Sequence, residues 1–116
     1  MKVERTKYVI WAADISRALA FYRDALDATV TRRSDLISEI EVAGATIGIH
    51  GGGTGRRTWT GMSFQVADVV EGAGEVVAAG GQLSREPTSD APGEEPHLAM
   101  CVDTEGNEIM LTRERS

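Results

Sequence analysis

The sequence predicts an α+β domain in which two βαβββ modules place curved sheets around a cavity. The first observation is a helix that follows a short strand and begins behind an aspartate. The second is that this unit recurs, because Asp68 follows Asp14 at an offset of 54 residues (68 − 14) and the preceding strands align at the same offset. The third is a further strand after each helix. A repeated strand, capped helix and strand in register indicates a duplicated module.

In the first copy we expect a strand at 6–12 and a helix at 15–26. Apolar residues of this helix recur at spacings of four, three and four, as on one buried helical face: Ile15, Leu19, Tyr22 and Leu26. Asp14 has a short acceptor side chain suited to the free amides of the first turn. Short alternating segments then predict strands at 29–32, 38–42 and 45–50, with Gly44 in the tight turn between the last two.

In the second copy a strand begins near Trp59, and we expect a helix from about Val69 to Ala79 that stops at Gly80 and Gly81. Glycines at 72 and 74 predict that this helix is looser than the first or packs closely against a neighbour. Strands are expected at 83–85, 97–102 and 107–112, and the Pro-rich segment 86–96 is expected to be a surface loop or a mobile lid.

The domain organisation that follows is one domain over residues 1–116. Module one covers about 1–50, a flexible glycine linker covers 51–55, and module two covers about 56–116.

Composition excludes several classes of protein. The net charge is −6 and the pI about 4.8, which argues against nucleic-acid binding and favours cationic small molecules. No apolar run approaches membrane-spanning length and no secretion signal is seen. The single cysteine, Cys101, has apolar neighbours and is interpreted as a buried structural thiol, so we expect a reducing cytoplasmic compartment.

Two motifs resemble the vicinal oxygen chelate superfamily, which includes glyoxalase I, extradiol dioxygenases, and fosfomycin- and bleomycin-resistance proteins. Residues 18–26, ALAFYRDAL, resemble its AxxFYxxxLG helix. Residues 103–107, DTEGN, resemble its DPDGN hairpin, with Thr104 in place of proline. The resemblance extends over essentially the whole chain and implies two modules whose sheets meet around a cavity.

The superfamily normally holds a divalent metal at four strand positions, which align here with Lys7, Gly48, Gly61 and Met110. A protonated lysine cannot donate an electron pair, glycine has no side chain, and methionine is too soft for Mg²⁺, Mn²⁺ or Fe²⁺. We therefore expect no metal, no cofactor and no catalytic residue of the usual kind, as in the bleomycin-resistance-like branch.

Strand alternation predicts which side chains face the cavity. The expected ligand-binding residues are Lys7, Val9, Trp11, Thr46, His50, Trp59, Ser63, Gln65, Glu108 and Met110. Two tryptophans with glycines at 48 and 61 favour a slot for a planar or hydrophobic ligand. The alternative is that both tryptophans fill the core or a dimer interface.

Three functions remain open. The leading hypothesis is a metal-independent protein that sequesters an aromatic antibiotic or secondary metabolite. The second is a metal-free enzyme with His50 or Glu108 as acid or base and Lys7 holding an anionic group. The third is a metal enzyme with misaligned ligands, drawn from His50, Glu108 and His97. The superfamily commonly builds its cavities across a dimer, so we also expect a homodimer and neither nucleic acid nor membrane as a partner.

Overall fold

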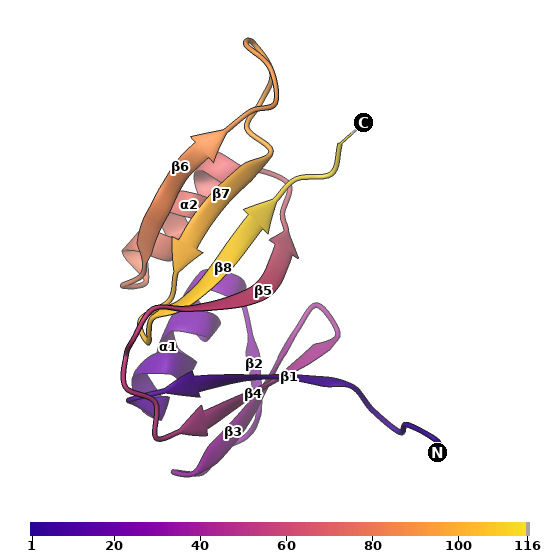
Figure 1. Cartoon of the computed structure of the whole chain (residues 1–116), viewed down its shortest axis with the longest axis vertical. Helices are drawn as coiled ribbons and strands as arrows, with labels where there is room; N and C mark the ends of the chain where they lie inside the picture. Colours follow the sequence, from indigo (N-terminus) through magenta and orange to yellow (C-terminus); the bar gives the residue numbers. More distant parts are fainter. Residues whose placement is uncertain (116) are drawn as a thin grey trace.

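The computed structural model describes residues 1–115 and contains ten elements, shown in Figure 1. The first module consists of β1 (Lys7–Ala12), α1 (Ile15–Leu26), β2 (Thr29–Arg32), β3 (Ile37–Val42) and β4 (Ala45–Gly51). The second module consists of β5 (Thr58–Gln65), α2 (Val69–Ala78), β6 (Gln82–Thr88), β7 (Leu98–Val102) and β8 (Asn107–Thr112).

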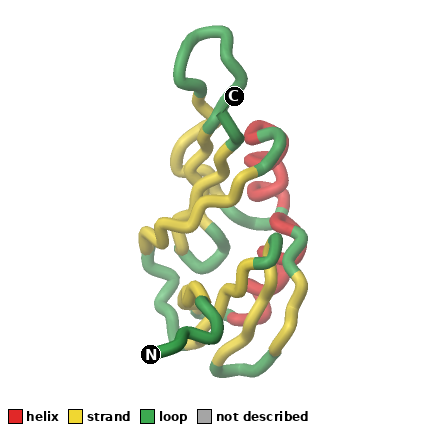
Figure 2. The backbone as a smooth tube through the Cα atoms, turned by 90° about the vertical axis from the view of Figure 1, so that its right-hand side faces the viewer, coloured by secondary structure: helices red, strands yellow, loops and turns green. Residues whose placement is uncertain are grey.

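Each module forms its own four-stranded mixed sheet, in the order β1-β4-β3-β2 and β5-β8-β7-β6. The first strand of each module runs parallel to the last, and the other neighbours are antiparallel. Both helices lie behind the sheets in Figure 1, and in the upper half of Figure 2 the helix α2 lies on the right and the strands of its module on the left. The predicted fold class is confirmed, with two βαβββ modules and curved sheets. The two sheets do not close on each other.

Both helices begin at the predicted aspartates. Oδ1 of Asp14 accepts a 3.0 Å hydrogen bond from the amide of Arg17, and Oδ1 of Asp68 accepts one of the same length from the amide of Glu71. The second helix ends before Gly80, whose φ of +100° suits glycine. Neither helix in the described part of the chain has the length and apolar composition needed to cross a bilayer.

The core lies between each helix and the sheet in front of it. Leu19, Phe21 and Tyr22 of α1 are at most 1% exposed, and α2 buries Val69 and Val76. A side chain at Gly72 would place its Cβ 3.1 Å from Leu111 of β8, so this glycine permits the close packing that was one of the two expectations for α2. Cys101 is also fully buried, and burial raises its pKa to about 11, which supports the structural interpretation of the thiol.

Two connecting segments differ from expectation. Strand β6 extends to Thr88, so the first residues of the expected loop at 86–96 belong to a strand. Pro87 is tolerated there because β6 is an edge strand. The first residue of the expected linker, Gly51, belongs to β4 and donates a 2.8 Å hydrogen bond from its amide to the carbonyl of Leu36, and the amide of Gly53 donates one of 3.0 Å to the carbonyl of Ala12. A Cβ at Gly53 would lie 2.9 Å from the Ala12 backbone, which explains the glycine.

Candidate binding face

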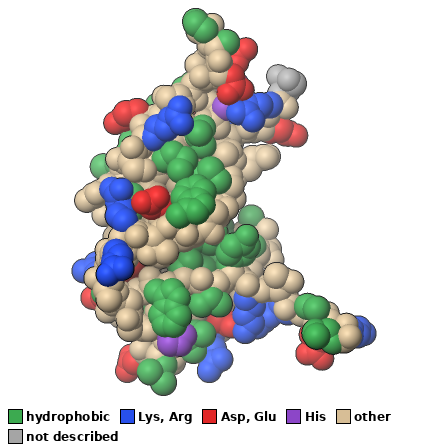
Figure 3. Space-filling model, in the orientation of Figure 1, with side chains coloured by type: hydrophobic (Ala, Val, Ile, Leu, Met, Phe, Trp, Pro, Cys, Tyr) green, Lys and Arg blue, Asp and Glu red, His purple; other side chains and the backbone are tan. Residues whose placement is uncertain are grey.

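Each sheet leaves the face opposite its helix uncovered, and we call these two open faces together the binding face. Both are turned to the same side of the molecule (Figures 1 and 2). Large apolar side chains lie exposed here: Val9 and Trp11 are each 51% exposed and Trp59 is 53% exposed. Figure 3 shows hydrophobic side chains gathered over the strands of both modules on this side. Contiguous exposed apolar surface of this kind marks interaction sites.

Half of the predicted site residues lie on the first sheet. Its five predicted members are Lys7, Val9 and Trp11 on β1 with Thr46 and His50 on β4. Because β1 and β4 are parallel neighbours, Lys7 lies opposite Thr46 and Trp11 lies opposite His50. Ile10 and Ala12 of the same strand are buried toward the helix, so the predicted alternation holds along the buried end of β1.

The Trp11 ring packs against the His50 ring, with centroids 4.3 Å apart and planes tilted by 43°. Nδ1 of His50 lies 2.7 Å from the carbonyl oxygen of Gly51. A carbonyl only accepts, so Nδ1 carries the proton and Nε2 of the neutral ring keeps its lone pair. The two rings form one aromatic surface, whose polar atoms include the indole N–H of Trp11 and Nε2 of His50.

Sequence reasoning missed Glu39, which lies on the open face of the first sheet. Its carboxylate accepts hydrogen bonds from Nζ of Lys7 at 2.7 Å and from Nη2 of Arg5 at 3.4 Å, and its side chain is only 8% exposed. The hydrogen bond from Lys7 lowers the pKa of Glu39. Its neighbours Ser38 and Ile40 are buried toward the helix, so alternation along β3 was a signal that pointed to Glu39.

The ion pair between Lys7 and Glu39 spans the strand β4. Lys7 is on β1 and Glu39 is on β3, with β4 between them, and the β4 residue opposite Glu39 is Gly48. The two charged side chains reach each other across β4 at 2.7 Å. A Cβ at Gly48 would lie 3.5 Å from Cγ2 of Val9 and 3.9 Å from Cδ1 of Ile37, so these apolar side chains border the space that the glycine leaves.

The other predicted residues lie on the second sheet: Trp59, Ser63 and Gln65 on β5, with Glu108 and Met110 on β8. Trp59 lies opposite Glu108 and Ser63 lies opposite Met110. Glu108 is partly covered and forms an ion pair of 3.7 Å with Arg57. This half of the face combines an indole and a thioether with few charges.

Gly61 departs from the expected alternation on β5. The register shifts between Trp59 and Ser63, and Gly61 has a φ of +75° within this bulge. Thr60 stabilises the bulge by donating a 2.6 Å hydrogen bond to the carbonyl of Glu108. Gly61 lines a cleft between the modules together with Ser63 and Gln65, and a Cβ there would meet no heavy atom within 4 Å, so this glycine leaves open space beside the cleft.

That cleft has a volume of about 690 Å³ and a mainly apolar lining. One side comes from the first module and the other from β5, and the lining residues are Tyr8, Ala25, Leu26, Asp27, Val42, Ala43, Ala45, Ile47 and Gly61 to Val66. The strands β1 and β5 beside it are both sheet edges. One chain thus has an apolar cleft between modules and an open binding face, whereas the sequence predicted a single cavity.

The DTEGN hairpin joins the two modules. Oδ2 of Asp103 accepts a 2.6 Å hydrogen bond from the Tyr22 hydroxyl of α1 and one of 2.9 Å from Nδ2 of Asn107. Nδ2 of Asn107 also donates to the carbonyl of Trp11 at 2.9 Å. Burial raises the pKa of Asp103, and the hydrogen bonds from Tyr22 and Asn107 oppose that rise. Both motifs that carry the resemblance therefore have a structural role at the contact between modules.

Glu105 of the same hairpin extends this contact. Its fully buried carboxylate accepts hydrogen bonds from Nε of Arg17 at 2.7 Å and from the amide of Asp14 at 2.9 Å. Burial raises the pKa of Glu105, but the hydrogen bonds from Arg17, Asp14 and Thr104 outweigh it and hold the pKa below its ordinary value. Thr104, which replaces the usual proline, donates to Oε2 of Glu105 at 2.8 Å.

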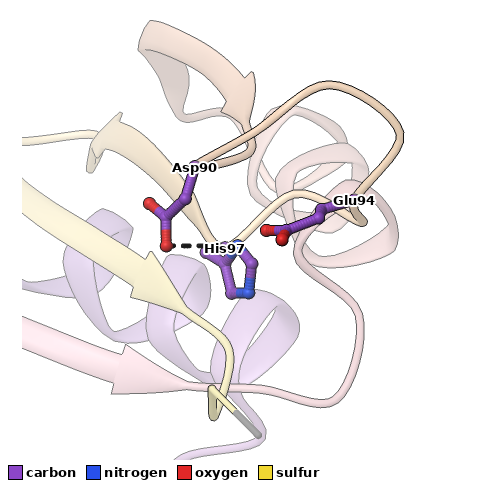
Figure 4. A group of neighbouring side chains, drawn as sticks. All are labelled: Asp90, Glu94 and His97. Carbon is purple, nitrogen blue, oxygen red and sulfur yellow. Dashed lines mark ion pairs between the residues drawn. The ribbon is translucent and has the colours of Figure 1, made fainter.

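Three residues that could bind a metal ion lie in the loop before β7, where the ligating atoms of Asp90, Glu94 and His97 are within 4.8 Å of one another (Figure 4). Nη2 of Arg113 lies 3.3 Å from Nε2 of His97. A guanidinium only donates, so the neutral ring carries its proton on Nδ1, which faces Asp90 at 3.8 Å. Arg115 already binds Asp90 at 2.7 Å. The proton on Nδ1 of His97 and the positive charges of Arg113 and Arg115 disfavour the binding of a metal cation here.

The positions that would hold the superfamily's metal do not fit one. The ammonium of Lys7 is held by Glu39, and Gly48 and Gly61 offer no ligand atom. Met110 supplies only a thioether, which is a poor ligand for hard divalent cations. The three residues considered for a misaligned centre are also dispersed, since His50 and Glu108 are on different sheets and His97 precedes β7.

The fold and the exposed face define a two-module βαβββ protein with an aromatic surface. The chain belongs to the glyoxalase-like domain family, whose family model matches residues 7–112. No protein of curated function matches the sequence.

Several solved structures share the fold. A fosfomycin-resistance protein, FosX, from Listeria monocytogenes has a TM-score of 0.80 at 19% identity, covering 99% of this chain and 96% of its own. The bleomycin-binding protein of Streptomyces verticillus has a TM-score of 0.70 at 16% identity, covering 99% of both chains. A glyoxalase/bleomycin resistance protein/dioxygenase family enzyme from Burkholderia phytofirmans has a TM-score of 0.74 at 18% identity, covering 92% of this chain and 95% of its own. Identities this low show the fold alone.

Proposed function

We propose that this protein binds an aromatic small molecule on its binding face, without a metal ion and without making or breaking a covalent bond. The observation that carries this proposal is the exposure of Trp11 and Trp59 at the strand faces, where each indole is about half accessible. Core tryptophans would be covered by the helix of their own module. Exposed indoles beside Val9 and Met110 provide stacking surface for a flat ligand.

Relatives of the same fold support a small-molecule role. The Streptomyces verticillus protein was solved with copper(II)-bleomycin, and a FosX variant was solved with Mn(II) and a dihydroxypropylphosphonic acid. The metal independence proposed for this chain rests on its own residues, above all on the Lys7–Glu39 ion pair at a position where a ligand would be needed.

The proposal includes a homodimer. In one chain both halves of the binding face are open, and β1 and β5 are unpaired edges beside an apolar cleft. Exposed edges and apolar clefts are normally covered in native proteins. A second copy placed against this side would cover them and enclose the ligand. Light scattering at micromolar concentration should give the mass of two chains, and a strictly monomeric mass would contradict the dimer.

A metal-free enzyme is the second candidate, and one observation favours it. Nδ1 of His50 is fixed by the Gly51 carbonyl, which leaves Nε2 as a potential base beside Trp11. Glu108 is a weaker choice because Arg57 is its ion-pair partner. Mass spectrometry of bound ligands after long incubation tests this: a product that the wild type forms and His50→Gln does not would establish the enzyme.

The test of binding is a thermal-shift screen of aromatic metabolites in the presence of EDTA, with indole emission as the second readout. We expect a subset of ligands to raise the melting temperature and to quench tryptophan emission. Ligands that raise the melting temperature only after a divalent ion is added would contradict metal independence. A screen without any stabilising aromatic ligand would contradict the proposed function itself.

A further inference from the structure

The first sheet's open face carries a charge that differs from that of the whole protein, whose net charge is −6. Around the Glu39 carboxylate lie Arg5, Lys7 and Arg32, and the charge of each lowers the pKa of Glu39. Glu41, two residues along β3, is exposed and lies opposite Thr46, which in turn lies opposite Lys7. Arg5, Lys7 and Arg32 thus outnumber the two carboxylates of β3, Glu39 and Glu41.

Exposure decides which of these charges a ligand can reach. The Glu39 side chain is 8% exposed, and both carboxylate oxygens already accept from Lys7 or Arg5. The Lys7 side chain is 40% exposed and that of Arg5 is 54% exposed. An ammonium has three donors and a guanidinium five, so both keep N–H groups free for a further acceptor. A ligand approaching this patch meets donors and no accessible carboxylate of Glu39.

An apolar strip leads from these donors to the aromatic surface. Lys7, Val9 and Trp11 alternate along one face of β1, and Lys7 and Trp11 are about 13 Å apart for four residues of strand. Between them the half-exposed Val9 lies beside Gly48, which adds no side chain of its own. The strip has the length of a fused two-ring aromatic with one polar substituent.

We propose that the ligand of the binding face carries an anionic group, such as a carboxylate, sulfonate or phosphate, that binds Lys7 and Arg5 while its aromatic part lies over Val9 toward Trp11. This inference rests on the proposed function and narrows its ligand class. It reverses the preference for cationic ligands that the net charge alone suggests.

Two dyes that differ in one group test the inference. 8-Anilinonaphthalene-1-sulfonate carries the anion, and N-phenyl-1-naphthylamine is the same skeleton without it. At low ionic strength the wild type should bind the sulfonate dye more tightly than the neutral dye. Added salt should weaken the binding of the sulfonate dye alone. Lys7→Gln should reduce sulfonate affinity roughly five- to tenfold by removing a charge-assisted contact at a partly exposed site. The neutral dye should be unaffected.

Three further variants sharpen the test. Glu39→Gln should raise sulfonate affinity, because Lys7 and Arg5 lose the carboxylate that neutralises them. Arg5→Gln leaves the Lys7–Glu39 pair in place and should weaken the binding of the sulfonate dye only. It replaces Lys7→Gln as the test if Lys7→Gln lowers the melting temperature. Lys2→Gln removes an N-terminal positive charge outside the patch and should change neither dye.

Each outcome separates the two proposals. Sulfonate binding that is no tighter than that of the neutral dye, or that ignores Lys7→Gln and Arg5→Gln, would overturn the anionic ligand while leaving aromatic binding intact. Absence of binding by both dyes would contradict the anionic ligand and the aromatic slot together. A sulfonate preference that is lost in Lys7→Gln and increased in Glu39→Gln supports the inference.

Discussion

The hydroxyl of Tyr22 in the first module donates a 2.6 Å hydrogen bond to Oδ2 of Asp103 in the second, and neither residue is more than 4% exposed. These two residues belong to the two motifs by which the chain resembles its family. Their contact fixes α1 against the hairpin that precedes β8. The halves of the binding face are thus held relative to each other by a buried polar contact behind it.

Replacing Tyr22 by phenylalanine should lower the free energy of unfolding by about 1–3 kcal/mol, because a buried carboxylate loses one donor. Urea denaturation measures this difference. Tyr8→Phe is the matched control: Tyr8 is 53% exposed, and removing its hydroxyl should change stability by less than about 0.5 kcal/mol. Equal effects of the two substitutions would contradict a linking role for Tyr22.

The pH dependence of stability should reflect Glu105. Its pKa in the folded protein lies below the ordinary value of 4.5, so its contribution is present above about that pH and is lost as the pH falls through the lowered pKa. Glu105→Gln should therefore be less stable than the wild type at neutral pH, with the difference shrinking in acid. Denaturation at a series of pH values measures it, and a constant difference would rule out the Arg17–Glu105 ion pair as its cause.

The tryptophans should affect binding more than folding. Trp11→Ala or Trp59→Ala should reduce affinity for an aromatic ligand about five- to 150-fold, if stacking contributes 1–3 kcal/mol as it does for bases on aromatic side chains. Because both indoles are half exposed, the melting temperature should change far less than in the core control Phe21→Ala, which should cost about 3–5 kcal/mol. Large destabilisation of both variants with unchanged affinity would identify them as fillers.

Periodicity was sufficient to predict the elements of this fold. Helix α1 and strands β2 and β8 have the predicted bounds, because alternation, capping aspartates and glycine turns are local signals. The bulge at Gly61 was not predicted, since a register shift depends on the pairing of β5 with β8 and leaves no period in the sequence. The extension of β6 through Pro87 was missed for a similar reason, because its position at a sheet edge is a tertiary property.

The candidate site could be predicted only in part. Alternation placed Val9, Trp11 and Trp59 on strand faces where the structure leaves them about half exposed, whereas Thr46 is only 9% exposed. It could not show that Lys7 forms an ion pair with Glu39, because that pair spans β4 and depends on sheet order. Nor could it show that both open faces are turned to one side, which depends on how the hairpin at Asp103 packs against α1. Whether these residues bind a ligand together stays a prediction.

The most direct test of the central claim is a fluorescence titration with an aromatic ligand from the screen, carried out once in EDTA and once with excess Mn²⁺. If the binding face acts without a metal, the dissociation constant should be the same in both solutions, and Trp11→Ala should weaken binding equally in both. Binding that disappears in EDTA and returns with Mn²⁺ would contradict the account and indicate a metal centre on this fold.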